Sequence, residues 1–281
     1  MNRLPKEKQK QIVAALVEGN SIRATCRMTG VAKGTVIKLL VDLGKACAEY
    51  QDKTLRNLTC KKIQCDEIWA FVYAKEKNLP KNKEGQFGYG DVWTFTAIDA
   101  ESKLVPTWHI GNRNIEDATI FMKDLAGRLK NKVQLTTDGH KMYLEAVEEA
   151  FGCEVDFSQL VKIYGTSPEA EKRYSPAECI GAEKHKITGK PDDDDISTSY
   201  VERQNLTMRM GMRRFTRLTN GFSKKALNLF YAESLYFMHY NFVRIHKTLR
   251  MTPAMKAGVT GRLWEIEDMI ALLDSHSKRV I

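Results

Sequence analysis

The stretch Lys61-Lys-Ile-Gln-Cys-Asp-Glu-Ile-Trp-Ala-Phe-Val-Tyr-Ala74 decides the fold. It is rich in β-branched and aromatic residues, which predicts a strand, and its second half is apolar on both faces. Asp66 lies inside this strand, although aspartate is depleted in strands and a buried carboxylate is costly unless it is paired or binds a cation. Asp66 therefore needs a partner, unless the edge of a sheet exposes it to solvent. The stretch alone leaves both interpretations open.

The segments that follow predict an α/β domain. The expected elements are strands at 91–99 and 104–110, a helix at 114–129, a strand at 133–137, a helix at 141–151 and a strand at 157–164. Each helix has an apolar stripe at the helical period, and each strand is short and apolar. This order is typical of a mixed sheet with helices packed against its faces.

A second carboxylate stands where one of these strands ends, in Thr137-Asp138-Gly139-His140. Asp-Gly is also a common hairpin signal, so a simple turn is the alternative. The helical stripe that follows indicates that the dipeptide closes a strand and opens a helix. Because ligands in open α/β sheets gather at the carboxyl ends of strands, Asp138 is a candidate site residue.

A third carboxylate lies in Ser199-Tyr-Val-Glu-Arg-Gln-Asn-Leu-Thr-Met-Arg-Met-Gly-Met-Arg-Arg-Phe-Thr-Arg217. At a helical period, Glu202 shares one stripe with Arg209 and Arg213. Carboxylate for a metal and guanidinium for phosphates suit an enzyme that cuts nucleic acid. The alternative is an exposed glutamate paired with its helical neighbours.

The net charge of +9 is unevenly distributed along the chain. Residues 1–60 carry +6, residues 61–196 carry −5 and residues 197–250 carry +8. Clustered positive charge is typical of a protein that binds nucleic acid, and an acidic centre would repel phosphate unless cations are bound there. An unevenly charged, solvated surface is the competing explanation.

The N-terminal block predicts three short helices, at 6–18, at 21–29 and from 31 to about Leu43. Gly30 separates the second from the third, as in a helix-turn-helix. The third helix would present Lys33, Thr35 and Lys38 to the major groove of DNA. A purely structural three-helix bundle is the alternative.

The remaining segments complete the expected domain organisation. A helix-turn-helix domain at 1–50 and a linker at 51–60 precede a catalytic domain at 61–250 and a helical tail at 251–281. Residues 165–196 are expected to be an irregular insertion, in which four aspartates at 192–195 form a solvated acidic run rather than a cation site.

The sequence gives no sign of a membrane segment or of a disulfide framework. It contains no long apolar run and no signal peptide, and its six cysteines form no Cys-x-x-Cys pair. We therefore expect reduced cysteines and a cytoplasmic protein.

The three acidic blocks resemble a known family. Asp66-Glu-Ile-Trp, Thr137-Asp-Gly-His-Lys-x-Tyr and Ser199-Tyr-Val-Glu-Arg-Gln-Asn205 place their acids 72 and 64 residues apart. They are similar to the signature blocks of bacterial insertion-sequence transposases of the Asp-Asp-Glu class, closest to the insertion-sequence-one family. His239-Tyr-Asn-Phe-Val-Arg-Ile-His246 is similar to the tail of these enzymes.

This resemblance implies a ribonuclease-H-like fold, a mixed sheet flanked by helices, preceded by a small all-α helix-turn-helix domain. It also implies cleavage and joining of DNA at transposon ends with two Mg²⁺ ions, for which Mn²⁺ should substitute. Carboxylates are suitable ligands for such hard cations. Asp66, Asp138 and Glu202 would bind the metals and carry the catalysis.

The expected partners are double-stranded DNA, as inverted-repeat ends and target, and a second copy of the chain. A homodimer is expected because joining two ends requires two active sites, and DNA binding would place the protein at the bacterial nucleoid. The predicted DNA contacts are Lys33, Thr35, Lys38, Arg203, Arg209, Arg213, Arg214, Asn241, Arg244 and His246. The alternatives are a helix-turn-helix regulator without catalysis and a ribonuclease-H-like nuclease.

Overall fold

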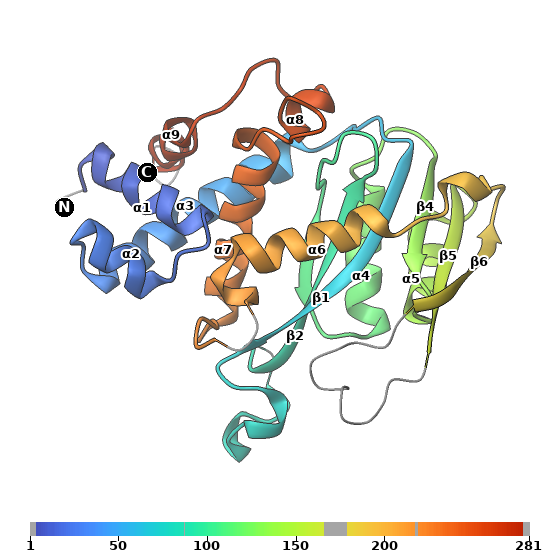
Figure 1. Cartoon of the computed structure of the whole chain (residues 1–281), viewed down its shortest axis with the longest axis horizontal. Coiled ribbons are helices and arrows are strands. Elements are labelled where there is room, and N and C mark those ends of the chain that lie inside the picture. The colour runs from blue at the N-terminus through green and yellow to red at the C-terminus, as the bar shows by residue number, and fades with distance from the viewer. Residues whose placement is uncertain (1–3, 87, 166–178, 217–218, 278–281) are drawn as a thin grey trace.

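A mixed sheet forms one side of the molecule, at the right in Figure 1, and the N-terminal helices lie at the other side. The computed structural model describes residues 4–86, 88–165, 179–216 and 219–277, without the side chains of 275–277. Within these residues six strands form one sheet in the order β3-β2-β1-β4-β5-β6. The strands are β1 (Lys62–Val72), β2 (Gly90–Asp99), β3 (Trp108–Gly111), β4 (Val133–Asp138), β5 (Val155–Tyr164) and β6 (Cys179–Thr188).

The strand predicted at 61–74 is β1, which lies inside the sheet and joins its two halves. It pairs antiparallel with β2 and parallel with β4, while β2 pairs antiparallel with β3 and β4 pairs parallel with β5. The expected α/β class is confirmed, because the structure has a mixed sheet flanked by helices.

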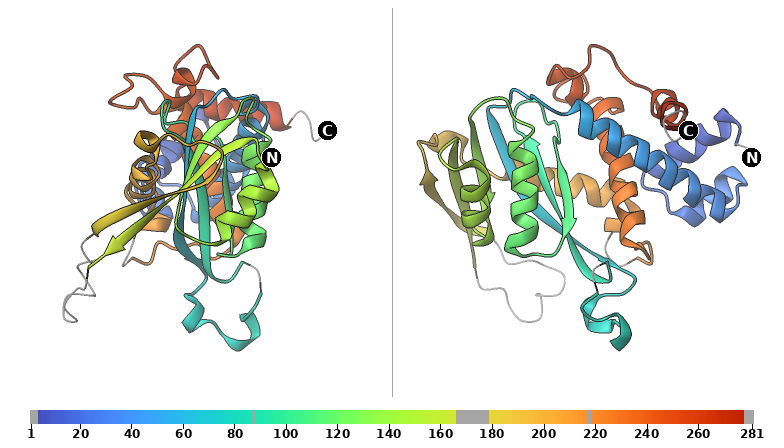
Figure 2. Two further views of the ribbon diagram at one scale, coloured as in Figure 1. Left: turned by 90° about the vertical axis from the view of Figure 1, so that its right-hand side faces the viewer. Right: turned by 180° about the vertical axis from the view of Figure 1, so that it is seen from behind.

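Helices cover both faces of the sheet, as the front and rear views show (Figures 1 and 2). Helices α4 and α5 pack against each other on one face, and α6 crosses the other. The helices are α1 (Lys6–Val17), α2 (Ile22–Thr29), α3 (Lys33–Thr54), α4 (Ile115–Ala126), α5 (Met142–Phe151), α6 (Ser199–Gly211), α7 (Ala226–Met238), α8 (Pro253–Lys256) and α9 (Ile266–Ser277). Short 3₁₀ turns are η1 (Glu76–Asn78), η2 (Lys81–Lys83), η3 (Asp193–Asp195) and η4 (Arg213–Phe215), and a π-helical turn, η5 (His239–Val243), follows α7.

The three predicted N-terminal helices are present, with Gly30 in a left-handed conformation between α2 and α3. The third is longer than predicted, because α3 runs to Thr54 instead of ending near Leu43. Its second half packs along α7, so apolar contacts continue the helix into the rest of the protein. Leu55 and Leu58, which fall in the predicted linker, are buried.

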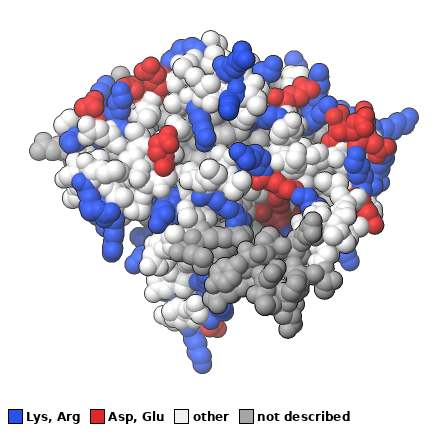
Figure 3. Space-filling model, in the orientation of Figure 1, with Lys and Arg blue, Asp and Glu red and all other residues white. Residues whose placement is uncertain are grey.

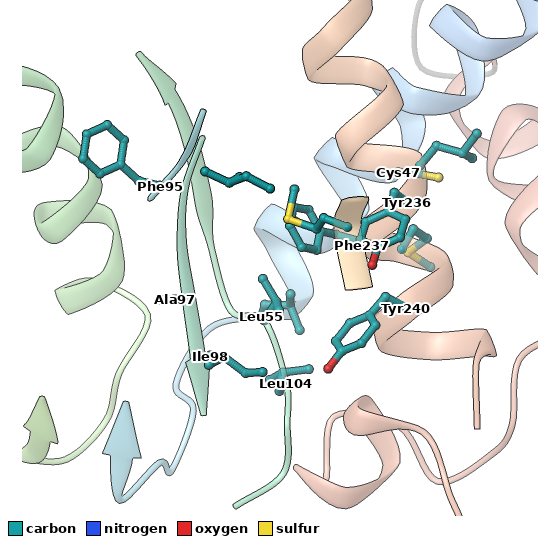
Figure 4. Packing of buried hydrophobic residues seen from close by; sticks show 14 of the residues in the cluster. Cys47, Leu55, Phe95, Ala97, Ile98, Leu104, Tyr236, Phe237 and Tyr240 are labelled. Carbon is teal, nitrogen blue, oxygen red and sulfur yellow. The ribbon is translucent and has the colours of Figure 1, made fainter. Parts of the chain in front are cut away.

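Helix α7 connects the N-terminal helices to the sheet. Phe237 stacks on Trp108, and the close-up shows α7 and η5 side chains facing Ile98 and Leu104 (Figure 4). Glu233 is fully buried, and the Thr94 hydroxyl donates a 3.0 Å hydrogen bond to it. Burial raises the pKa of Glu233.

Two predicted element assignments were wrong. Residues 179–188, expected to be irregular, form β6, which pairs with β5 although nearly all of its side chains are exposed. Backbone hydrogen bonds to β5 therefore hold this strand in place. Its sequence lacks the apolar face from which a strand can be predicted. The predicted strand at 104–110 begins only at Trp108, since Leu104 and Val105 are buried outside the ladder. Residues 166–178 of the expected insertion lie outside the described residues.

The aspartate run at 192–195 belongs to a network of ion pairs. Asp193 pairs with Lys186 at 2.7 Å, and Asp195 pairs with Lys62. Asp192, Asp193 and Asp194 are exposed, as expected for a solvated run, whereas Asp195 is half-buried in its ion pair. None of the helices described here is both long and apolar enough to cross a membrane.

Gly44 tests the contact between α3 and α7. A Cβ atom on Gly44 would lie 2.5 Å from the backbone oxygen of Tyr231, which cannot move aside like a flexible side chain. We expect Gly44→Ala to lower the free energy of unfolding in urea by about 1–3 kcal/mol, the usual cost of overpacking.

Gly34→Ala is the matched control, because Gly34 lies in the same helix with open space around its Cβ position. It should leave stability unchanged or raise it by up to about 1 kcal/mol, since alanine favours helix. Equal effects of the two substitutions would contradict the close packing of α3 on α7.

Candidate active site

Adjacent parallel strands bring Asp66 and Asp138 together. In the parallel register Gln64 lies beside Thr136 and Cys65 beside Thr137, which puts Asp138 next to Asp66. Because side chains alternate along a strand, both aspartates belong to the sheet face that α6 crosses. The candidate partner for Asp66 is therefore a carboxylate 72 residues away in sequence.

The Glu67 carboxylate lies close to the carboxylates of the two aspartates. One carboxylate oxygen from each of Asp66, Glu67 and Asp138 lies within 4.8 Å of the other two. The Glu67 side chain is only 1% exposed, and the Tyr143 hydroxyl donates a 2.8 Å hydrogen bond to it. The group can offer oxygen ligands to a divalent cation.

Helix α6 begins directly above this part of β1. The Gln64 side-chain oxygen accepts hydrogen bonds from the backbone N–H groups of Tyr200, at 2.8 Å, and Val201, at 3.2 Å. One turn further along α6, Asn205 Nδ2 donates to Asp66 Oδ2 at 2.8 Å. These contacts fix the helix that carries Glu202 over the strand that carries Asp66.

Glu202 lies near the carboxylate group but outside it among the described residues. Its two oxygens accept hydrogen bonds from Lys162 on β5 and from Thr198. Its negative charge contributes to the raised pKa of Asp66, so the carboxylates are electrostatically coupled. The structure thus brings Asp66 and Asp138 together and turns Glu202 towards a lysine beside them.

Arg113 supplies a second positive charge near the carboxylates, in addition to that of Lys162. Its Nε donates to Glu67, and its Nη2 lies 3.8 Å from Asp138 Oδ2. Arg113 follows β3, and Lys162 stands on β5, so two separate strands provide cations to the carboxylates. Both residues act on the acids that a metal would bind.

The carboxylates are not fully compensated by these cations. Burial raises the pKa of Asp66 to about 7, and the charges of Glu67 and Asp138 add to the increase. Burial and the charge of Glu67 also raise the pKa of Asp138. Closely spaced, partly desolvated carboxylates of this kind favour binding of a cation. The donor set therefore fits a divalent metal.

The predicted DNA-contact residues occupy different environments. Lys33, Thr35, Lys38, Arg203, Arg213 and Arg244 are exposed, whereas Arg209, Arg214 and His246 are half-buried. Lys38 also pairs with Asp42 at 2.7 Å. In the space-filling view, Lys and Arg side chains lie on several sides of a central acidic group (Figure 3).

Asn241 requires a correction. Its side chain is fully buried, accepts a 3.0 Å hydrogen bond from Val105 N and donates a 2.9 Å hydrogen bond to Val105 O. An amide that satisfies both backbone groups of an adjacent segment stabilises the fold. Asn241 therefore has a structural role in place of the predicted DNA contact.

Several residues of this site were not predicted from sequence. Alternation along the strand assigns Glu67 to the face opposite Asp66, yet one of its carboxylate oxygens lies within 4.8 Å of an oxygen of Asp66 and of Asp138. Asn205, three residues after Glu202, had a readable signal, because that spacing puts both side chains on one helix face. Gln64, Arg113 and Lys162 had no signal beyond their residue type.

Comparison with known proteins adds only a similarity of fold. No family model and no curated protein sequence matches this chain. Solved structures of Mos1 resemble it. The Mos1 strand transfer complex matches over 94% of this chain and 82% of that chain at 11% identity, with a TM-score of 0.25.

Two further Mos1 structures are similar to a comparable extent. A pre-cleavage Mos1 transpososome matches 94% of this chain and 82% of that one at 10% identity, with a TM-score of 0.26. The Mos1 mariner paired end complex with Mn covers 85% and 78% at 12% identity, with a TM-score of 0.22. Scores of this size support no argument about the site.

The raised pKa of Asp66 predicts a pH-dependent effect of Asp66→Asn in metal-free protein. With its pKa higher when folded than when unfolded, ionised Asp66 destabilises the fold above about pH 7, and the penalty disappears below the unfolded pKa near 4. In urea with chelator, Asp66→Asn should therefore be more stable than the unsubstituted protein by on the order of 2–4 kcal/mol at pH 8, and by less at pH 5.

Glu148→Gln is a suitable control, since Glu148 is exposed on α5. It should show no such pH-dependent difference. A gain for Asp66→Asn that is the same at pH 5 and pH 8 would contradict the raised pKa.

Proposed function

We propose that this chain is a DNA transposase that cleaves transposon ends and joins the freed 3′-hydroxyl to target DNA. The observation that carries the proposal is the meeting of Asp66 and Asp138 on adjacent strands, with α6 holding Glu202 beside them. Three carboxylates brought from distant parts of the chain suit metal-dependent phosphodiester chemistry.

In this proposal Asp66, Asp138 and Glu202 hold two Mg²⁺ ions, or Mn²⁺ in their place, and Glu67 helps to position them. When bound there, such ions would activate the attacking oxygen and stabilise the leaving oxygen of an in-line displacement. The carboxylates suit this task because the partly buried group leaves negative charge that Arg113 and Lys162 only partly neutralise.

Arg113 and Lys162 have a second task in the proposal. Both are about one-third exposed, so their side chains are free to turn from the carboxylates towards solvent. Once a metal neutralises the acids, these two cations would orient the phosphates of the scissile strand. Arg203, Arg209, Arg213 and Arg214, on and after α6, would extend the phosphate contacts.

The N-terminal helices would recognise the inverted-repeat ends. Lys33, Thr35 and Lys38 are exposed at the start of α3, where a recognition helix contacts base edges. Arg244 and His246 would contribute backbone contacts. We propose residues 1–50 as the end-recognition module, residues 61–250 as the catalytic domain, and a homodimer as the assembly that holds two ends.

A ribonuclease-H-like nuclease is the second candidate, because the same carboxylates could cleave without joining. A regulator without catalysis accounts for the N-terminal helices but leaves the clustered carboxylates without a purpose. End recognition followed by strand transfer uses both parts of the chain, and the basic charge of each flanking block supports it.

The test is cleavage and joining of a labelled end. The protein is incubated with Mg²⁺, a duplex carrying the terminal repeat of the element that encodes it, and a supercoiled target plasmid. We expect nicking at the end and transfer of the label to the plasmid. Asp66→Asn, Asp138→Asn and Glu202→Gln should each reduce the rate by about three orders of magnitude, because residues of one catalytic unit fail together.

Glu148→Gln should keep the full rate, and binding of the end should survive all four substitutions. Nicking without transfer would favour the nuclease. Unchanged cleavage in the three site variants would refute the proposed site.

A further inference from the structure

A large pocket separates the N-terminal helices from α7, away from the carboxylates. Its volume is about 670 Å³, and α1, α2, α3, η4 and α7 all contribute to its walls. The turn between α1 and α2 touches the end of α6, since a Cβ atom on Gly19 would lie 3.1 Å from the Met210 oxygen. The pocket therefore lies between parts of the protein that are packed against each other.

Six cationic residues line this pocket, and no carboxylate does: Arg23, Arg27, Lys33, Arg213, Arg214 and Lys224. Elsewhere on this protein cations pair readily with acids, as Lys38 does with Asp42. Within the described residues, none of the six forms an ion pair. Arg214 donates a 2.9 Å hydrogen bond to the Ser223 hydroxyl. Arg214 also interacts electrostatically with the buried carboxyl of Glu233, and the pocket lining as a whole concentrates positive charge that an anion would neutralise.

The lining of the pocket combines the six cationic residues, called the rim below, with apolar residues, called the floor. Ile37, Phe222 and Leu235 are among the apolar residues that line it. Phe222 is half-buried, and its ring lies 4.9 Å from that of Phe71, which fixes it in place. A free phosphate ion would make no favourable contact with an apolar floor, and a DNA duplex is too wide to enter this pocket. A nucleotide carries both an apolar base and a charged phosphate.

We propose that this pocket binds one unpaired nucleotide of a DNA strand, with its base on the apolar floor and its phosphates on the basic rim. The inference rests on the proposed function in so far as DNA is the ligand. Aromatic and apolar floors combined with cationic walls are how proteins hold single-stranded nucleic acid. A nucleotide held here would anchor the strand between the end-recognition helices and the catalytic domain.

Binding of two labelled single-stranded oligomers, measured by fluorescence anisotropy with chelator, tests the proposal. One is an oligothymidylate, and the other is an abasic oligomer with the same number of phosphates. We expect the base-bearing oligomer to bind about tenfold more tightly, within the range that stacking one base provides. Equal affinities would overturn the proposal.

Two substitutions fill the floor without changing charge. Asn228 and Ala232 line the pocket one turn apart on α7, and Asn228 is half-exposed, which favours correct folding of its variants. Asn228→Trp should abolish the tenfold preference and leave abasic binding unchanged, and Ala232→Met should reduce the preference. A preference that survives both substitutions would overturn the assignment.

Adjacent lysines provide a matched pair for the rim. Lys224 lines the pocket and Lys225 does not. Lys224→Ala should weaken both oligomers and make the slope of log affinity against log salt shallower by about 0.7, the loss of one single-strand phosphate contact. Lys225→Ala should change neither oligomer's affinity. Equal effects of the two substitutions would contradict the rim assignment.

Free thymidine monophosphate distinguishes DNA from a mononucleotide ligand. It should compete only at far higher concentration than the oligomer, and competition at equal concentration would overturn the assignment to DNA. Asp138→Asn should bind both oligomers normally, because the assay contains no metal and needs no cleavage. Absence of end cleavage by the unsubstituted protein, together with an intact base preference, would therefore refute the transposase and leave the pocket assignment standing.

Discussion

The hydrogen bonds from the start of α6 to Gln64 are the constraint on which the site depends. The first N–H groups of a helix have no partner within the helix, and a buried strand side chain here accepts two of them. Gln64 precedes Asp66 by two residues, so both side chains point to the same face of β1. The strand that carries the first aspartate therefore also fixes the helix that carries Glu202. Glu202 lies in the first turn of α6, where the positive end of the helix dipole favours its charge.

Charge balance is the second constraint on this region. Asp66, Glu67 and Asp138 are held close together, although like charges at this spacing repel each other. Arg113 and Lys162 offset part of that repulsion. The repulsion that remains contributes to the raised pKa of Asp66. An arrangement that costs folding energy in the absence of a cation is well suited to bind one.

Sequence reasoning was most successful where one pattern had one physical cause. The apolar strand at 61–74 and the Asp-Gly between strand and helix predicted a mixed α/β sheet with Asp138 at a strand end, and the family resemblance implied that Asp66 and Asp138 meet. Features held by distant contacts gave no local signal. Strand β6 is held by pairing with the edge of β5, and the length of α3 results from its packing on α7. Asn241 is held in the interior by its hydrogen bonds to Val105. Glu67 was missed because alternation along β1 assigns it to the face opposite Asp66, and its approach to Asp138 depends on tertiary structure.

A crystal of this protein soaked in Mn²⁺ tests the central claim most directly, since anomalous scattering locates the metal without any assay of activity. The account predicts Mn²⁺ bound to Asp66 and Asp138, with the Glu202 carboxylate turned from Lys162 towards the metal. Absence of Mn²⁺ from these carboxylates, with ions only at exposed acids such as Asp192 and Asp194, would contradict it.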